Sequence, residues 1–232
     1  MRKSIITLGV IGIIVGALFA VGPIVRLYTD DGGLRTASVK TGGEPATTDV
    51  NGAWEIVPGS GNNQTQAGYT FNEVLPGQKK STSGRADNQR EENIKGHFMV
   101  KDGVLTEGSV TVRVDGISSD VEKRDINVRR EIFETDKYPE ASFTLTKPVD
   151  ISDIPGDGTP GEATVTGDLE LHGQHKSVTS PFTILRTGET VVISANIDIN
   201  RLDFGVKTPE FVAAEVDEEG TIDVLLVLEK RA

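Results

Sequence analysis

Three histidines are the side chains best suited to metal or acid–base chemistry, because the chain contains no cysteine. His172 and His175 flank Gly173, and His97 lies in a separate stretch of alternating apolar and polar residues. Two histidines and a third ligand could bind zinc, but no carboxylate-rich sequence is close to the pair, and the turn should be exposed. The pattern favours ordinary turn residues, and we expect no metal and no cofactor.

Nucleophilic catalysis requires a nucleophile, a base and an orienting group together. Serines are plentiful, but none stands in a nucleophile-elbow motif. Arg124 and Asp125 form a neighbouring charged pair, and Glu131 and Glu134 follow. Paired carboxylates can act as acid and base, but such a charge run is more typical of a solvated face or of an ion pair that fixes a loop. We therefore expect no enzymatic activity.

The stretch from Ala163 to Ile184 contains the histidine pair and shows how the surrounding elements are built. Residues alternate between apolar and polar from Ala163 to Leu171, and alternation resumes at Val178 after a turn that contains Gly173. A period of two is typical of a strand with one buried face and one solvated face. Two such runs joined by a short turn with glycine predict a β-hairpin.

Alternation of this kind recurs from Trp54 to Leu228 in about eight short segments. In the last segment Leu225 and Val227 make the second face apolar too, which predicts a strand covered on both sides. Short turns imply antiparallel pairing. The predicted fold class is all-β, and such a set of strands can close as a barrel or stack as a sandwich.

Residues 118–133 interrupt the alternation. We interpret this stretch as a short helical segment, with Ser119 or Asp120 as its N-cap. Tyr138 and Pro139 should end it, because a residue that precedes proline is disfavoured in the helical region.

Residues 1–27 are predicted to form one N-terminal transmembrane helix. Two basic residues precede an apolar run from Ile5 to Val25, which matches the roughly 20 residues needed to span a bilayer. Positive charge before the run places the remainder of the chain outside the cytoplasm. The predicted location is therefore the cell membrane, with a single pass. The alternative is a cleaved signal peptide and a secreted protein, although the best cleavage site, after Ala20, has the bulky Leu18 where a small residue is preferred.

Composition limits the partners and divides the exported part of the chain. The formal net charge is −11, which argues against binding to nucleic acid or to an anionic membrane surface. Residues 28–51 are rich in Gly, Thr and Asp without an apolar period, which predicts a flexible linker. Residues 52–232 then form the β-domain. The sequence leaves the oligomeric state open.

Four motifs in the exported part resemble those of the YceI-like family. They are Ser118-Ser119-Asp120 followed by Arg124-Asp125, Tyr138-Pro139-Glu140-Ala141-Ser142-Phe143, Gly167-Asp168-Leu169-Glu170-Leu171-His172-Gly173, and Arg201-Leu202-Asp203-Phe204-Gly205-Val206. The resemblance covers about Gly52 to Glu229. A Gly-Tyr pair followed by Glu within residues 66–73 resembles the membrane-anchored Gram-positive branch of that family.

The resemblance implies an exported, lipocalin-like, extended antiparallel barrel that encloses a long polyisoprenoid or a similar amphiphile. The apolar rows by themselves fit a lipid slot and a filled barrel equally well. We predict a non-catalytic carrier of an isoprenoid-type lipid. The alternatives are a structural or interaction module with a filled barrel and an enzyme that acts on a lipid inside the slot. The predicted apolar cavity wall consists of Tyr69, Phe71, Phe98, Val112, Phe143, Leu169, Phe182, Ile193 and Ile197.

Basic side chains in the loops are candidates for holding a lipid headgroup, because arginine and lysine suit a phosphate. The predicted headgroup residues are Lys79, Lys80, Arg85, Arg124, Arg129 and Arg130.

Overall fold

Strands form most of the regular structure of this protein. The computed structural model describes residues 32–39, 42–75, 78–208 and 215–231. The predicted anchor, residues 1–27, lies outside the described residues. Within the part that is described, no helix has the length and apolar content required to cross a membrane.

The strands follow one another along the chain with short connections. They are β1 (Gly52–Val57), β2 (Gly59–Ser60), β3 (Asn63–Gln64), β4 (Gln66–Leu75), β5 (Gln78–Asp87), β6 (Ile94–Lys101), β7 (Val104–Arg113), β8 (Glu140–Leu145), β9 (Val149–Asp150), β10 (Gly161–Leu171), β11 (Gln174–Thr187), β12 (Thr190–Asn200) and β13 (Glu215–Lys230).

Eight of these strands close into a barrel. Their order is β1-β6-β7-β8-β10-β11-β12-β13, and β13 also pairs with β1. All of these neighbours are antiparallel. The predicted all-β antiparallel barrel of about eight strands is therefore confirmed, and so is the predicted hairpin, which is β10 and β11.

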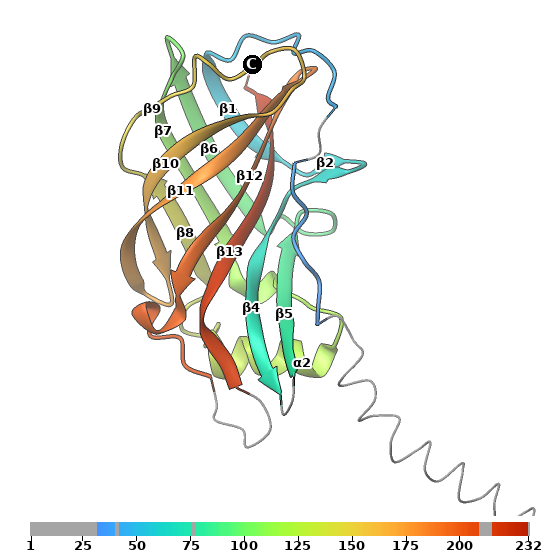
Figure 1. Cartoon of the computed structure of the whole chain (residues 1–232), viewed down its shortest axis with the longest axis vertical. Helices are drawn as coiled ribbons and strands as arrows, with labels where there is room; N and C mark the ends of the chain where they lie inside the picture. Colours follow the sequence, from blue (N-terminus) through green and yellow to red (C-terminus); the bar gives the residue numbers. More distant parts are fainter. Residues whose placement is uncertain (1–31, 40–41, 76–77, 209–214, 232) are drawn as a thin grey trace, which may run out of the picture. The chain divides into compact units, whose positions relative to one another are not determined.

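Strand β13 pairs with two different strands along one edge. Near its C-terminal end Val227 lies opposite Val57 of β1, whereas Leu225 lies opposite Gln66 of β4. β4 in turn pairs with β5 along its whole length. The barrel wall consequently continues as β1 and β6 in its upper part and as β4 and β5 in its lower part (Figure 1).

A helical stretch fills the lower part of the wall beyond β5. It comprises η1 (Val114–Gly116), the helix α2 (Glu122–Asn127) and the π-helical turn η2 (Val128–Ile132). Backbone hydrogen bonds in both directions join Arg85 of β5 to Ser118, which follows η1. Its apolar side chains Val114, Ile117, Val128 and Phe133 are buried in the barrel core. The stretch therefore replaces a strand and closes the interior with side chains.

The start of α2 differs from the predicted N-cap. Val121 occupies the N-cap position and makes no side-chain capping hydrogen bond. Ser119 instead donates from its backbone N–H and from its hydroxyl to the buried carboxylate of Asp125, at 2.8 and 2.6 Å. Asp125 lies in the first turn of α2, and its carboxylate holds Ser119 in the segment that precedes the helix.

Residues 33–39, which we call the outer segment, lie against the outside of the barrel, although the sequence predicts a flexible linker there. The Val39 amide donates to the Ser194 hydroxyl over 3.2 Å, and the Ala37 amide donates to the Gln66 side chain over 3.1 Å. Further along, Ala46 pairs with Gly188 at the turn between β11 and β12. Figure 1 shows this part of the chain in blue, running along the outside of the barrel.

The outer segment covers an apolar cluster on the outer face of the sheet. Its residues Ala37 and Val39 pack, together with Val57, against Leu185, Val192, Leu225 and Val227. This arrangement confirms that the last strand is covered on both sides, and it places Ala37 and Val39 of the predicted linker in contact with the barrel.

The substitution Leu225→Ala tests this contact. The Leu225 side chain is fully buried on the outer face, so we expect the free energy of unfolding in urea to fall by about 2–5 kcal/mol. Leu202→Ala is the control, because Leu202 is 43% exposed and should cost no more than about 0.5 kcal/mol. Equal, small losses for both variants would mean that the outer segment does not cover the cluster.

Candidate functional site

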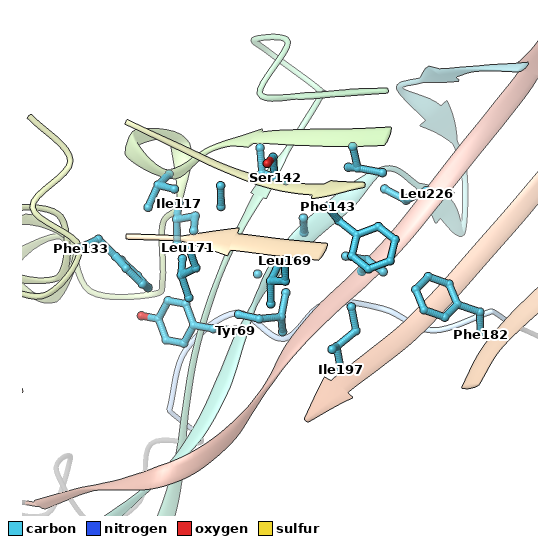
Figure 2. A pocket seen from close by; sticks show the side chains of 18 residues that line it. Tyr69, Ile117, Phe133, Ser142, Phe143, Leu169, Leu171, Phe182, Ile197 and Leu226 are labelled. Atoms are coloured by element: carbon cyan, nitrogen blue, oxygen red, sulfur yellow. The ribbon is translucent and has the colours of Figure 1, made fainter. Parts of the chain in front are cut away.

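Three cavities follow one another along the interior of the barrel. The middle cavity has a volume of about 80 Å³, and almost all of its lining side chains are apolar. Figure 2 shows the side chains that line it, with Phe143 and Phe182 near one end and Tyr69, Phe133 and Leu171 near the other. A cavity with walls of this kind stays free of water and accepts an apolar guest.

The two other cavities extend this interior in opposite directions. The lower cavity, about 120 Å³, lies toward α2 and is lined by Phe71, Val128 and Ile199 among others. The upper cavity, about 40 Å³, is lined by Trp54 and Leu228 among others. A water-sized group needs roughly 10–15 Å³ of space for its centre, so each cavity holds several such groups. A long hydrocarbon chain would need all three cavities joined.

The structure places all nine predicted wall residues inside the barrel. Tyr69, Val112, Phe143, Leu169, Phe182 and Ile197 line the middle cavity. Tyr69 and Phe71 line the lower cavity, and Phe98 and Ile193 line the upper one. Their contact with a ligand stays a prediction.

Two glycines give the aromatic rings their positions along the wall. A Cβ atom added at Gly167 would collide with the Phe143 ring, and one added at Gly220 would collide with the Phe71 ring. Each ring therefore lies over the backbone of a neighbouring strand. Because the rings lie against the wall, space remains at the centre of the barrel.

Four side chains line both the middle and the lower cavity and separate them: Tyr69, Phe133, Leu171 and Ile222. We call this set the constriction. The rings of Tyr69 and Phe133 meet edge to face, with centroids 5.7 Å apart. Tyr69 lies on β4, Phe133 follows the helical stretch, Leu171 ends β10 and Ile222 lies on β13. Four separate parts of the fold therefore meet at this point.

Polar side chains are most numerous at the lower cavity, whereas Ser142 lines the middle cavity and Arg186 the upper one. Those at the lower cavity are Glu73, Thr82, Arg124, Arg201 and Thr208. Arg201 is 9% exposed and donates to the backbone carbonyls of Asp217, Val206 and Val216, over 2.9 to 3.2 Å. Arg124 donates to the Asp120 carboxylate at 2.7 Å. The lower end can therefore present two guanidinium groups to an anion.

The structure does not bring the six predicted headgroup residues together. Arg124 lines the lower cavity, and the other five do not line any of the three cavities. Lys79 pairs with Asp217 at 3.5 Å, Arg129 donates to the Ile117 carbonyl, and Arg85 donates to the Arg35 carbonyl. Arg130 is exposed on η2, and Lys80 is half-buried on β5.

Arg201 was missed by the sequence analysis as a candidate ligand contact. It stands in the motif Arg201–Val206, which forms η3 (Arg201–Phe204) and the residues after it. The sequence feature that could have identified Arg201 is its position directly after the long apolar alternation of β12, where the interior ends.

The three histidines have separate partners. His172 contacts Glu134 at 2.9 Å, His175 contacts Asp168 at 2.7 Å, and His97 contacts the Ser109 hydroxyl at 3.1 Å. Within the described ranges, no group of three or more His, Asp or Glu side chains is placed to hold a metal ion.

The Tyr69 phenol gives a test of how dry the interior is. Burial raises the pKa of Tyr69 to about 12, and the charge of Arg124 opposes this rise only in part. An unfolded tyrosine has a pKa of about 10. The folded state therefore keeps the neutral form, and this contribution to stability is complete below about pH 10 and is lost as the pH rises toward 12.

We expect an ultraviolet titration of the folded protein to show one phenol that ionises near pH 12, and the substitution Tyr69→Phe to remove it. Tyr138→Phe is the control, and it should leave that late transition in place. A late transition that survives in Tyr69→Phe would contradict a dry interior at Tyr69.

Comparison with known proteins agrees with this geometry. Residues 61–228 match the family described as YceI-like domain, and a search of curated proteins finds no match. One similar solved structure is described as a polyisoprenoid binding domain from Saccharophagus degradans implicated in plant cell wall breakdown. It is 14% identical, has a TM-score of 0.53, and the match covers 72% of this chain and 98% of that one.

A second similar structure is BcnA of Burkholderia cenocepacia, which is 21% identical with a TM-score of 0.52; the match covers 68% of this chain and 95% of that one. At these identities the likeness concerns the fold. The family match spans well over half of the 232 residues, and this chain therefore belongs to the YceI-like domain family.

Proposed function

We propose that this protein binds and carries a long-chain isoprenoid or a similar amphiphilic lipid inside its barrel, without catalysis. The observation that carries the proposal is the row of three apolar cavities that ends at Arg124 and Arg201. An apolar interior whose lower end carries two arginines matches an amphiphile with a polar head. At the upper end one arginine, Arg186, lines the cavity and donates to the Ile154 carbonyl over 3.4 Å. This chain belongs to the YceI-like domain family, and its fold is similar to that of a structure described as a polyisoprenoid binding domain. Both observations support this choice.

The apolar tail would supply most of the affinity. Burial of each methylene group contributes about 0.8 kcal/mol, although ordering the chain and the side chains removes much of that gain. The headgroup contacts would then fix the direction of the bound lipid and select among lipids with similar tails.

An anionic headgroup, such as a phosphate or diphosphate, fits the lower end best. Arg201 is held by three backbone carbonyls, so its guanidinium is fixed in place before a ligand arrives. Arg124 is paired with Asp120, and its side chain is 28% exposed, so it can turn toward an incoming anion. Charge-assisted hydrogen bonds of this kind are stronger than neutral ones.

The proposed location is outside the cytoplasm, at the cell membrane. The apolar run from Ile5 to Val25 and the basic residues before it support a single-pass anchor. Cleavage of this segment would instead release the barrel as a secreted protein. A place in the membrane-anchored Gram-positive branch agrees with the anchored form.

A non-catalytic interaction module with a filled barrel is the second candidate. The constriction favours it, because Tyr69, Phe133, Leu171 and Ile222 divide the interior into separate spaces. Under this alternative the barrel's own side chains would occupy most of the interior, no lipid would bind there, and the loops would bind a partner.

The substitution Ala141→Trp distinguishes the two candidates. Ala141 lines the middle cavity, so an indole there should fill it and reduce the amount of co-purifying lipid at least about tenfold, which corresponds to 1.4 kcal/mol. The measurement is native mass spectrometry with solvent extraction of the purified protein. Thr144→Trp is the matched control, because Thr144 is exposed on the same strand β8. If the wild-type barrel releases no lipid, the carrier proposal fails.

The substitution Arg124→Gln tests the headgroup. We expect the affinity for geranylgeranyl diphosphate to fall about tenfold, as for the loss of one hydrogen bond to a charged group, and the affinity for geranylgeraniol, which lacks phosphate, to stay the same. Arg113→Gln is the control, because Arg113 pairs with Asp115 away from the cavity. Equal losses for both lipids would remove Arg124 from headgroup binding.

A further inference from the structure

His172 has hydrogen-bond acceptors at both of its ring nitrogens. Its Nε2 lies 2.9 Å from the Glu134 carboxylate, and its Nδ1 lies 3.3 Å from the Phe204 carbonyl oxygen. The Tyr138 ring packs against the imidazole, with the ring centroids 4.2 Å apart. The His172 side chain is 10% exposed. It therefore joins the β10–β11 turn, the end of the helical stretch and η3.

We call the contact between Glu134 and His172 the bridge. Both of its residues have an unusual backbone conformation. His172 has a φ of +53° and Glu134 a φ of +45°. Both values lie in the left-handed region, which residues other than glycine rarely adopt. At His172 the hairpin turn accounts for this conformation, because a two-residue turn between β10 and β11 needs a positive φ at both His172 and Gly173. The turn thereby fixes the backbone from which the His172 side chain reaches Glu134.

Three of the four motifs from the sequence analysis meet at this histidine. Tyr138 begins one motif, His172 ends another with Gly173, and Phe204 belongs to the third. Gly173 lies directly under the Tyr138 ring, where an added Cβ would come within 2.7 Å of its Cε1 atom. Segments that are far apart in the sequence are joined here, next to the lower cavity.

The bridge lies directly beside the constriction. Phe133 is the chain neighbour of Glu134, and Leu171 is the chain neighbour of His172. Phe133 and Leu171 both line the middle and the lower cavity, and Figure 2 shows them close to Tyr69. A bridge between Glu134 and His172 therefore limits how far Phe133 and Leu171 can separate.

We propose that His172 is a positioning residue that holds the constriction closed, so that a lipid passes between the lower and the middle cavity only when the Glu134–His172 bridge opens. The proposal rests on the proposed carrier function. It assigns to His172 control over the rate at which a lipid enters and leaves, without contact with the lipid.

The bridge can form a charge-assisted hydrogen bond, because an imidazole N–H at Nε2 can donate to the Glu134 carboxylate. Such a bond is stronger than one between neutral groups. η3 contributes the Phe204 backbone carbonyl, which lies at the other ring nitrogen.

The first test measures transfer of radiolabelled geranylgeranyl diphosphate from the full-length protein to an excess of phosphatidylcholine vesicles. We expect His172→Gln to transfer the lipid about tenfold faster than wild type, the change expected for loss of one charge-assisted hydrogen bond. The amount bound at saturation should stay the same.

His175→Gln is the matched control, because His175 also contacts a carboxylate, that of Asp168, on the exposed face of the same hairpin. It should transfer lipid at the wild-type rate. Glu134→Ala removes the bridge from its more exposed side and should reproduce His172→Gln if that variant folds poorly. A wild-type rate in both bridge variants, or an equal effect of His175→Gln, would overturn the proposal.

The second test needs no ligand and separates the two proposals. Hydrogen–deuterium exchange in residues 122–133 of the lipid-free protein should be faster in His172→Gln and unchanged in His175→Gln. If no variant binds the probe lipid but the exchange still differs in this way, the carrier function fails and the bridge stands. If the exchange is unchanged in His172→Gln, the bridge does not restrain the helical stretch and the proposal is wrong.

Discussion

The division of one sheet edge between two strands is the constraint on which the rest of this structure depends. β13 has sixteen residues and pairs with β1 near one end and with β4 along the remainder. The wall therefore changes strands partway along the barrel, and a helical stretch completes it below β5. Side chains of this stretch, such as Phe133, close this part of the interior, so side-chain packing forms the boundary of the lower cavity there.

The interior combines two kinds of wall. Most of it is a rigid lattice of antiparallel strands, in which Gly167 and Gly220 let aromatic rings lie over the backbone. The remainder is the helical stretch, held to the strands by few backbone hydrogen bonds and by buried polar contacts such as that of Asp125 with Ser119. A carrier needs a wall that excludes water and a part that yields to a ligand, and local stability is rarely uniform across a fold. Under the proposed carrier function, this barrel would assign those tasks to different elements.

Local alternation in the sequence was enough to predict most strands, the hairpin and the placement of the wall residues, because a period of two determines which side chains face inward. Local alternation missed β5, because residues 78–87 are mostly polar and resemble a loop. It could not predict the position of residues 33–39. Their contacts join backbone amides to side chains far along the chain, such as Val39 to Ser194, and these leave no periodic pattern. The apolar outer face at Leu225 and Val227 was the one local sign of a cover.

The lower end of the cavity was predicted less well for a related reason. Charges in loops are numerous in this chain, and sequence position does not tell which of them face inward. Arg124 does, but Lys79 pairs with Asp217 instead, and Arg201 could be recognised as part of the cavity only once η3 had been placed.

An experimental electron-density map of the protein purified from the cells that produce it naturally tests the central claim most directly. The account predicts one continuous, narrow feature that runs through the middle and lower cavities, with the Phe133 and Leu171 side chains displaced around it and its polar end beside Arg124 and Arg201. An interior with these side chains in contact and no density beyond protein atoms would contradict a lipid-carrying barrel.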